Sequence, residues 1–532
     1  MADIKLRAVA FVPVRLNSSR LPEKHLKYIG RQRTLLSWVI LRLKGALEID
    51  DIVICTTCEK ENEQLRDAAL LEGVSFFAYD GGVDDVVGRL TAASVKYRAD
   101  ICVLASGDCP LLSSETIDLM VKTLRENTEA DNVLFSDVNG RQPIHEGIIV
   151  SRRKLWQLAD KYSDTPALRE HQFPVFLRNV YPDKFAHIKN VYVKDNEIFY
   201  NLNHRISIDT PDDLKFINRL FFLLQTQGSE FNLKNAITAI IENPEICNIN
   251  KHVYRKTLED VTLRVAFFVS PGTACGYDNL RRALEIAGVL VNRFGLGVGF
   301  FVPDDESKKF VQMQGLRADT AEAGKLVDFH KDFSFNAVVF DIDNNYYIDR
   351  ELIDTLRTSV GAKVIVISNI FRDSICPDML IASTLNYTVN NSKCKVKSGK
   401  DYIVIPQEIK DATIDIAAKE DKLVIYSYGD SFIPRLAEKL SEQDIGFRQK
   451  FYDSVSAEFL SDFASSKVLL CTMGNRAYEA IYLNCVPIIV SVNPKESHEI
   501  AVFNRYLKEL KPHDFENGAV NIAKVIVDLL EK

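Results

Sequence analysis

Short apolar runs alternate with amphipathic stretches along the first half of the chain. The first run, Ala8 to Val14, is rich in alanine and β-branched residues and predicts a buried strand. Similar runs separated by segments of helical periodicity favour parallel β/α units. The predicted strands are 52–57, 75–79, 101–106, 132–137, 147–150 and 205–209, and the predicted helices are 35–47, 59–72, 83–97, 155–162, 170–179 and 211–220.

The same alternation resumes after a weakly patterned region that contains one helix, at 233–242, and a polar stretch, 243–260. A long helix is predicted at 280–293, and strands are predicted at 263–269, 298–302, 336–341, 363–368, 422–428, 468–472 and 486–492. Two such βα series predict two Rossmann-like lobes with a cleft between them. We therefore divide the chain into a domain at 1–230, a helical linker at 231–262 and a two-lobed domain at 263–532.

Composition narrows the class of protein. A hydrophobic fraction of 46% and a charged fraction of 26% are ordinary for a globular protein, and the net charge of −7 argues against nucleic-acid binding. The chain has no apolar run of the roughly 18 residues that a membrane span needs. It also shows no signal-peptide pattern at its N-terminus, so a cytoplasmic protein is expected. The ten cysteines are scattered, several within apolar strands, which favours reduced thiols and argues against zinc.

Basic and hydroxyl side chains follow the first strand directly. The strand stops at Arg15, and the loop after it carries Ser19, Arg20 and Lys24. The carboxyl end of a strand is where open α/β sheets build phosphate sites, and arginine and lysine are the side chains that bind phosphate oxygens. This loop therefore predicts a site for a small anion, with a merely solvated basic loop as the alternative.

Two acids are predicted to lie at the same edge of the sheet. Asp108 follows the strand 101–106 in S-G-D-C-P, and Asp209 ends the predicted strand 205–209 in R-I-S-I-D-T-P. Mg²⁺ prefers one or two carboxylates together with substrate oxygens, so the pair is a candidate metal site. The alternative is that each aspartate is a turn or helix-cap residue.

The order R-x-x-S-S-R-L-P-x-K-x-L, residues 15–26, resembles the signature of the sugar-activating cytidylyltransferases. The SpsF type and the 3-deoxy-manno-octulosonate type are most similar, and the sialic-acid CMP synthetases are more distant. The resemblance covers residues 7–225 and implies a GT-A-like Rossmann-type nucleotidyltransferase fold. Glu23 departs from the pattern, because these families often place glycine there.

The resemblance also implies roles for individual residues. G-D-C-P and D-T-P-x-D match the two metal-binding acids of these enzymes, so Asp108 and Asp209 are expected to hold Mg²⁺. The other implied roles are triphosphate binding by Arg15, Ser19, Arg20 and Lys24, nucleotide binding by Asp85 and Arg89, and acceptor binding by Glu146, Arg169 and His171. A salt-bridging helix start at Asp85 and Arg89, and structural roles for the acceptor-side residues, remain the alternatives.

The reaction implied is Mg²⁺-dependent transfer of CMP from CTP to a small acceptor, with release of pyrophosphate. A sugar acid of the nonulosonic kind is the expected acceptor, and a sugar phosphate or polyol phosphate is the other possibility. Such a product would serve surface-glycan biosynthesis.

The C-terminal half resembles a second family over residues 263–510. CGYDNLRRALEIA, residues 275–287, resembles the G-x-G-H-x-x-R opening of PseG, the UDP-sugar hydrolase of pseudaminic-acid synthesis, and 471–490 resembles its donor-binding stretch. The implied fold is GT-B-like, with a nucleotide sugar or related ligand. The candidate ligand residues are Asp278, Asn279, Arg282, Gly474 and Glu479.

The second resemblance breaks at the residue that would activate water. The PseG base is a histidine, and Asn279 occupies its position, with Asp278 in place of the second glycine. Asparagine has no group that titrates near neutral pH, so binding without hydrolysis is expected. Two alternatives stay open: the C-terminal half is a glycosyltransferase or other transferase that uses the activated product, or it is a non-catalytic module for binding or for homodimer formation.

Overall fold

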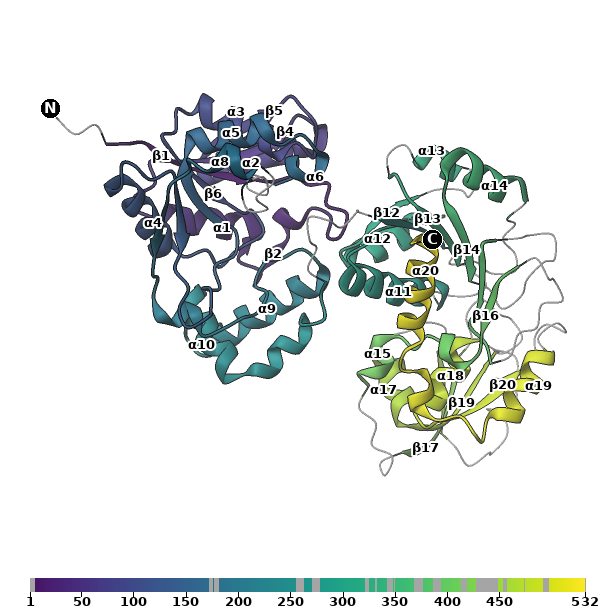
Figure 1. Cartoon of the computed structure of the whole chain (residues 1–532). Coiled ribbons are helices and arrows are strands. Elements are labelled where there is room, and N and C mark those ends of the chain that lie inside the picture. Colours follow the sequence, from purple (N-terminus) through teal and green to yellow (C-terminus); the bar gives the residue numbers. More distant parts are fainter. Residues whose placement is uncertain are drawn as a thin grey trace. The chain divides into compact units, whose positions relative to one another are not determined.

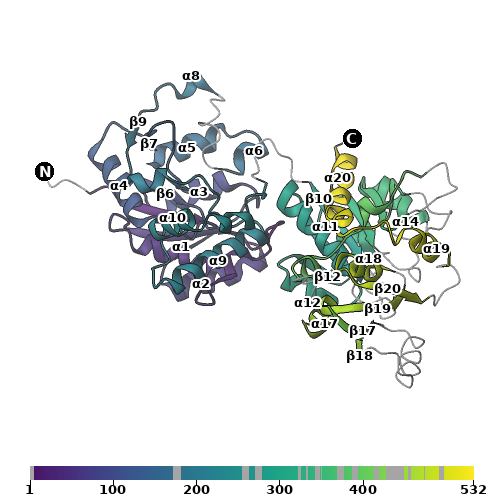
Figure 2. The ribbon, with the colours of Figure 1, turned by 90° about the horizontal axis from the view of Figure 1, so that it is seen from below.

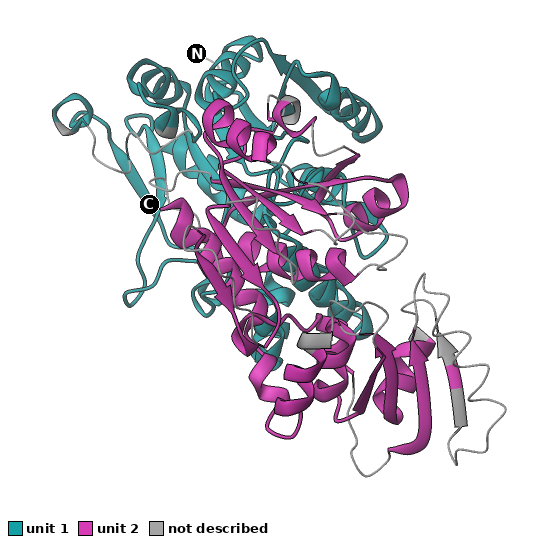
Figure 3. Cartoon of the chain, turned by 90° about the vertical axis from the view of Figure 1, so that its right-hand side faces the viewer, with its two compact units in different colours: residues 1–261 teal, residues 262–532 magenta. Residues whose placement is uncertain are grey.

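The computed structural model describes residues 5–171, 176, 181–254, 263–269, 278–320, 325–330, 333–341, 348, 350–367, 377–385, 394–412, 419–426, 448–452, 457–472, 474–490 and 497–531. The chain divides into two compact units, residues 1–261 and 262–532, which Figure 3 colours teal and magenta. Each unit is an α/β structure. Within the described part of the chain, no helix is long and apolar enough to cross a membrane.

The first unit is built on a seven-stranded sheet in the order β5-β4-β1-β6-β8-β7-β9. Its strands are β1 (Ala8–Pro13), β4 (Asp51–Thr57), β5 (Ser75–Tyr79), β6 (Ile101–Ala105), β7 (Asn132–Phe135), β8 (Ile148–Arg152) and β9 (Asn190–Val193). β1 lies between β4 and β6 and runs parallel to both. A small antiparallel hairpin, β2 (Tyr28–Ile29) and β3 (Arg33–Thr34), stands apart from this sheet.

Helices cover both faces of the sheet because successive residues of β1 point to opposite sides. Ala8, Ala10 and Val12 face one core, which includes residues of α1, α4, α9 and α10, whereas Val9 and Phe11 face α3 and α5 (Figure 1). The helices of this unit are α1 (Leu35–Lys44), α2 (Glu63–Glu72), α3 (Val86–Lys96), α4 (Ser114–Glu126), α5 (Arg153–Tyr162), α6 (Pro166–Arg169), α8 (Pro182–Phe185), α9 (Pro211–Thr226) and α10 (Leu233–Glu242), with short 3₁₀ turns at η1 (Lys24–Leu26), η2 (Lys60–Asn62), η3 (Glu197–Tyr200) and η4 (Pro244–Ile249).

Three features of this unit differ from the sequence-based expectation. The alternation favours parallel units throughout, but β8 runs antiparallel to both β6 and β7. Residues 205–209 are not a strand. The backbone–backbone hydrogen bond of this segment to the neighbouring loop runs from the Ile208 N–H to the Asp108 carbonyl (2.9 Å). Helix α10 packs into the main core through Leu233, Ile237 and Ile240, so it belongs to the first unit and not to a linker. The helix expected at 170–179 falls mostly outside the described residues.

The second unit contains two separate sheets whose strands all run parallel. The larger sheet has the order β12-β11-β10-β13-β14-β15-β16, and the smaller has the order β18-β17-β19-β20. The strands are β10 (Arg264–Val269), β11 (Gly297–Val302), β12 (Arg317–Thr320), β13 (Ala337–Asp341), β14 (Lys363–Ile367), β15 (Met379–Ala382), β16 (Val396–Ser398), β17 (Glu420–Tyr426), β18 (Arg448–Tyr452), β19 (Ser466–Thr472) and β20 (Val486–Val490). Two parallel sheets are consistent with two α/β lobes.

The last helix of the chain returns to the larger sheet. α20 (Gly518–Leu530) packs beside α11 (Asp278–Phe294), and Ile522 and Ile526 share a core with Val265 of β10 (Figures 1 and 2). The remaining helices are α12 (Asp305–Met313), α13 (Leu326–Phe329), α14 (Arg350–Thr355), α15 (Gln407–Lys410), α17 (Ala457–Ser465), α18 (Asn475–Tyr482) and α19 (Ser497–Tyr506), with shorter turns at η6 (Leu356–Val360), η7 (Lys400–Tyr402) and η10 (Pro512–Phe515).

Candidate active site

The basic loop and the first acid leave the sheet side by side. β1 and β6 are adjacent parallel strands, so the loops after Pro13 and Ala105 begin at the same edge. Gly107 allows the two loops to touch: a Cβ atom there would lie 2.5 Å from Val14 Cγ1 and 3.0 Å from His25 Nε2. The close approach brings Asp108 up to the loop that carries Lys24.

Lys24 lies between the two predicted metal ligands. Its Nζ donates to Asp108 Oδ2 (2.9 Å), to Asp209 Oδ1 (2.8 Å) and to the Ile208 carbonyl (3.1 Å), and the residue is only 9% exposed. The Ser106 hydroxyl donates to the other oxygen of Asp108 (2.7 Å). The structure therefore brings the two acids together, and it places between them the lysine that the sequence assigns to the triphosphate.

Asp209 also receives two arginines. Arg20 Nη2 lies 3.3 Å from Asp209 Oδ2, and Arg205 pairs with the same oxygen. Arg205 is anchored in turn by the fully buried Asp213 (3.1 Å), whose side chain caps α9 and accepts the backbone N–H groups of Asp209 (3.1 Å) and Thr210 (3.0 Å). A capping box thus fixes the Asp209 turn, although residues 205–209 form no strand.

The charges in this cluster reinforce one another. Burial alone would raise the pKa of Asp209, but Lys24, Arg20 and Arg205 outweigh it and hold that pKa well below its ordinary value. Burial would likewise raise the pKa of Asp108, yet the Lys24 charge leaves it lowered. For Lys24, burial opposes the charged form, and the two carboxylates more than compensate, so its pKa is raised. All three groups are therefore ionised near neutral pH.

His25 is the neutral member of the cluster. Burial, and then the neighbouring Lys24 charge, lower its pKa to about 3. Its Nδ1 lies 3.0 Å from the Arg15 carbonyl, which can only accept, so the neutral ring carries its proton on Nδ1 and donates it there. His25 therefore supports the backbone of the basic loop without adding charge to it.

The donor set fits a hard divalent cation that takes part of its coordination from a substrate. Asp108 and Asp209 supply carboxylate oxygens that already converge on one cationic atom, Lys24 Nζ. Among the described residues, no group of three or more histidine, cysteine, aspartate or glutamate side chains is placed to hold a metal. Two carboxylates without a third ligand suit Mg²⁺, which usually keeps waters and substrate oxygens in its shell.

The rest of the basic loop surrounds this cluster. Arg15 pairs with the exposed Asp84, and Ser19 is half-buried in the same loop. The Nη1 atom of Arg20 is buried and has no hydrogen-bond partner among the described residues. Glu23 adopts a left-handed conformation (φ 52°, ψ 29°), which glycine adopts at lower cost than glutamate.

The two residues predicted to bind the nucleotide, Asp85 and Arg89, lie at the start of α3. Asp85 caps this helix by accepting the Gly88 N–H (2.9 Å), and it pairs with Arg169 (2.8 Å). Arg169 also bonds Asp160 Oδ1 (2.7 Å). Arg89 is 1% exposed and bonds the Val83 carbonyl. The structure therefore joins a predicted nucleotide residue, Asp85, to a predicted acceptor residue, Arg169, in one ion pair.

The acceptor-side elements divide between buried and exposed positions. Glu146 accepts the backbone N–H of Ser207 (2.9 Å), which ties it to the segment before Asp209. The neighbouring His145 is buried against Phe135 and Phe199 and contacts Asp195 (2.7 Å), so it is part of the packing. His171 is exposed at the end of a described stretch.

Gly147 sets the position of the Asp108 loop. It has a φ of +75°, and a Cβ atom there would lie 2.5 Å from Ser106 Cβ and 2.9 Å from Cys109 Sγ. We expect Gly147→Ala to lower the free energy of unfolding by about 2–4 kcal/mol, combining a left-handed alanine with overpacking. Gly140→Ala is the matched control: its φ is +74° but nothing lies within 4 Å, so only the conformational part, about 1 kcal/mol, is expected. Equal losses in urea unfolding would show that the clash is absent.

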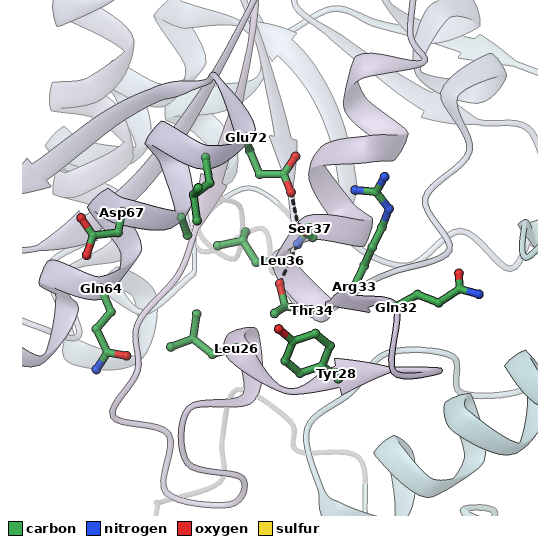
Figure 4. A pocket seen from close by; sticks show the side chains of 12 residues that line it. Leu26, Tyr28, Gln32, Arg33, Thr34, Leu36, Ser37, Gln64, Asp67 and Glu72 are labelled. Carbon is green, nitrogen blue, oxygen red and sulfur yellow. Dashed lines mark hydrogen bonds between the residues drawn. The ribbon is translucent and has the colours of Figure 1, made fainter.

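A separate hollow of about 730 Å³ lies beside the same loop (Figure 4). Leu26 and Tyr28 line it on one side, Thr34 and Ser37 of the α1 start on another, and Asp67 and Glu72 of α2 on the third. None of the predicted site residues lines it. The hollow is therefore distinct from the acid cluster.

The predicted ligand residues of the second unit come together where α11 meets α18. Arg282 bonds Asp341 through Nε (2.9 Å) and Nη2 (2.5 Å), and Nη2 also donates to Asn279 Oδ1 (2.9 Å). Asp341 ends β13 and is fully buried; burial raises its pKa despite the adjacent Arg282. Arg282 and Asn279 are thus committed to each other and to a strand end.

The α18 residues are equally engaged. Arg476 bonds Asp278 Oδ1 (2.5 Å) and pairs with Glu479, which is fully buried, and Arg281 Nη1 lies 3.6 Å from the other Glu479 oxygen. Gly474 precedes α18 with an extended backbone (φ 158°). Asp278, Asn279, Arg282 and Glu479 belong to one polar network that, together with Arg281 and Arg476, links α11 to α18. Gly474 supplies only the backbone before α18. Residues 275–277, which precede Asp278 in the predicted motif, lie outside the described residues.

Sequence reasoning missed several contributors to the first site. Arg205 and Asp213 fix Asp209, Ser106 bonds Asp108, and Asp84 pairs with Arg15. The description of the cysteines as scattered is wrong at one place, because Cys55 and Cys58 have C-x-x-C spacing. Both thiols are free, and burial raises the pKa of Cys55 far above its ordinary range.

Comparison with known proteins identifies the first unit. A cytidylyltransferase family profile matches residues 9–242. An uncharacterized protein of Methanocaldococcus jannaschii is 30% identical over 259 residues, which is 48% of this chain and 99% of that protein. The 3-deoxy-manno-octulosonate cytidylyltransferase of Bdellovibrio bacteriovorus is 25% identical over 126 residues, or 24% of this chain, and the chain spans about half (49%) of its length.

Among solved structures, a cytidylyltransferase from Leptospira borgpetersenii is similar at 26% identity with a TM-score of 0.39, covering 47% of this chain and 99% of that one. MurG of Acinetobacter baumannii is similar at 11% identity with a TM-score of 0.31, covering 50% of this chain and 99% of that one.

Proposed function

Because the N-terminal half of this chain belongs to the cytidylyltransferase family and is a CTP-dependent nucleotidyltransferase, we propose that it transfers CMP to a sugar acid and releases pyrophosphate. The supporting observation is the convergence of Lys24, Asp108 and Asp209 at the carboxyl edge of β1 and β6. A relative of stated activity, the Bdellovibrio enzyme, is named for a sugar acid, 3-deoxy-manno-octulosonate. A sugar phosphate or polyol phosphate is the second candidate acceptor.

In the proposed reaction, an acceptor oxygen attacks the α-phosphorus of CTP. The bond from that phosphorus to the α,β-bridging oxygen breaks, pyrophosphate leaves, and the acceptor hydroxyl loses its proton to solvent. Arg15, Arg20 and Lys24 would bind the triphosphate, with Ser19 donating a hydrogen bond. Arg20 Nη1 suits this role because it is buried and donates no hydrogen bond to the described residues. Arginine nitrogens can only donate, so a phosphate oxygen would satisfy it.

Asp108 and Asp209 would hold Mg²⁺, which would supply neutralisation of charge on the phosphates. Catalysis would then come mainly from positioning and from electrostatic stabilisation. Nucleotide roles for Asp85 and Arg89, and acceptor roles for Glu146, Arg169 and His171, stay predictions. The ion pair between Asp85 and Arg169 suggests that the two sets act together.

A substrate screen tests this proposal. Purified full-length protein would be incubated with each of the four nucleoside triphosphates and with sugar acids, sugar phosphates or polyol phosphates, and pyrophosphate would be measured. Release that requires CTP and a sugar acid is expected. Release only with a phosphorylated acceptor would show that the acceptor is a sugar phosphate or polyol phosphate and not a sugar acid. No release with CTP and any acceptor would contradict the proposal.

We further propose that the second unit is a GT-B-like module that binds a nucleotide sugar or related ligand without hydrolysing it. Asn279 replaces the expected base, and its side-chain oxygen accepts from Arg282, while Asp278 is held by Arg476. Neither side chain is free to activate water. A transferase that uses the activated product and a non-catalytic or homodimer-forming module are the other candidates.

We therefore expect the full-length protein to release no UDP from UDP-sugars above the uncatalysed background, because Asn279 stands where the resemblance places the general base. The measurement is UDP formed over time, including with the PseG substrate, alongside the Asn279→His variant. Turnover by the wild-type protein that is lost in Asp278→Asn would show that the neighbouring acid acts as the base.

A further inference from the structure

Each cation of the basic loop already has a carboxylate partner. Arg15 pairs with Asp84, and Arg20 lies 3.3 Å from Asp209. Lys24 lies 2.9 Å from Asp108 and 2.8 Å from Asp209. The cationic side chains proposed to bind the triphosphate are therefore paired with carboxylates, and two of these carboxylates are the acids proposed to hold the metal.

The central pair of contacts is shielded from water. The side chain of Lys24 is 11% exposed, and those of Asp108 and Asp209 are each 21% exposed. The other charged groups that face these acids are Arg20 and Arg205, both on Asp209, while His25 beside Lys24 is neutral. Lys24 is thus the one cation that contacts both acids among the described residues. Breaking a buried ion pair leaves an uncompensated charge, so separating Lys24 from the two acids costs free energy unless each receives a new partner.

Building on the proposed function, we propose that Lys24 is the counter-ion of Asp108 and Asp209 when no metal is bound to them, so that a metal, which takes the two acids, and a triphosphate, which takes Lys24, bind cooperatively. A divalent cation alone must push the Lys24 ammonium away from both carboxylates and leave it buried without them. A triphosphate alone must draw Lys24 away and leave two like-charged acids facing each other. When both bind, each broken ion pair is replaced by a new one.

This exchange gives affinity changes of unusual sign. If Lys24 only bound phosphate, its removal would leave metal affinity in the absence of nucleotide unchanged. If it is the counter-ion, removing it leaves Asp108 without a cationic partner and Asp209 with only its two arginines, and so strengthens metal binding. In the same way, neutralising Asp108 removes one of the two carboxylates that hold Lys24 and strengthens binding of metal-free CTP, although Asp108 is a proposed metal ligand.

The first measurement uses Mn²⁺ alone, titrated into the full-length protein without nucleotide and followed by the electron paramagnetic resonance signal of free Mn²⁺. We expect Lys24→Met to bind Mn²⁺ about ten-fold more tightly than the wild type, which corresponds to one charge-assisted contact. Lys27→Met, which removes the same charge three residues along the chain, is the matched control and is expected to change the affinity less than two-fold. Lys24→Gln serves as a second variant in case the methionine disturbs folding.

The second measurement uses CTP in excess chelator, titrated by calorimetry. Asp108→Asn is expected to bind metal-free CTP about ten-fold more tightly than the wild type. Asp67→Asn, on the exposed surface of α2, is the charge-matched control and should not differ from the wild type.

Unchanged or weaker Mn²⁺ binding by both Lys24 variants would overturn the inference, and so would weaker binding of metal-free CTP by Asp108→Asn. The pyrophosphate assay separates this outcome from a failure of the proposed function. Pyrophosphate release without the two affinity gains contradicts the inference alone. Both affinity gains without release from any acceptor contradict the proposed reaction alone.

Discussion

Asp209→Asn and Asp108→Asn are each expected to reduce pyrophosphate release from CTP by about a thousand-fold or more, because each removes a charged oxygen ligand for the metal that neutralises the phosphates. Both acids lie at the carboxyl edge of the first sheet and converge on Lys24. Asparagine keeps the size of the side chain and removes its charge. The measurement is the rate of pyrophosphate release at limiting Mg²⁺, with far-ultraviolet circular dichroism to confirm folding.

Asp212→Asn is the matched control for this pair of variants. Asp212 lies in the same D-T-P-D-D segment but pairs with Lys215 (2.9 Å) and His252 (3.0 Å), away from Lys24. Its activity is expected to stay within about two-fold of the wild type. Near-normal turnover by Asp108→Asn or Asp209→Asn would remove that residue from the metal site.

Arg282→Met is expected to lower the free energy of unfolding of the second unit by about 3–5 kcal/mol, because it leaves the fully buried Asp341 without its counter-charge. Asn279 and Asn475 would also lose contacts with this guanidinium. Urea unfolding of the full chain measures the effect as a shift of one of its transitions. Arg293→Met, at the exposed end of the same helix, is the control and should cost less than about 0.5 kcal/mol.

The pH dependence of this variant has a defined sign. Burial raises the pKa of Asp341 in the folded state, so the folded state holds this proton more tightly than the unfolded state. Stability from this group is therefore greatest at low pH and falls as pH rises toward the folded-state pKa. Without Arg282 the pKa rises further, and the loss in Arg282→Met should be larger at pH 8 than at pH 5.5. A loss that grows on acidification, or an Arg282→Met/Asp341→Leu double variant no more stable than the single one, would contradict this account.

The local pattern of apolar residues was sufficient to predict most of the strands and helices. β4, β5 and β13 lie within a residue of their predicted ranges, because a buried strand is a short apolar run whatever its neighbours are. Strand direction is a different matter. The run at 147–150 looks like its parallel neighbours, and only its pairing with β6 and β7 makes β8 antiparallel. Residues 205–209 have strand-like composition, but they lie beside the Asp108 loop instead of a strand edge, so no ladder forms.

The candidate site was predictable where topology decides it and not where side chains choose their partners. The ends of adjacent parallel strands must meet, which brought Arg15 and Asp108 to one edge as expected. The contact that the Lys24 side chain makes depends on which charges lie near it in three dimensions, and in this structure it pairs with Asp108 and Asp209. In the second unit, the resemblance to PseG implied a ligand site at Asp278 and Glu479, but it gave no indication that Arg476 would pair with both.

The return of α20 to the larger sheet of the second unit has a consequence for the order in which the chain matures on the ribosome. The core around Val265 and Phe267 is incomplete until Ile522, Ala523 and Ile526 arrive. The first unit draws its whole core from residues before 262, so it can close while synthesis continues. The lobe after it must wait, with the apolar faces of β10 and α11 uncovered, until almost all of the remaining chain has been made. That interval is when this protein most needs a chaperone, and a nonsense mutation before Gly518 would leave an intact first unit tethered to a lobe that never finishes folding.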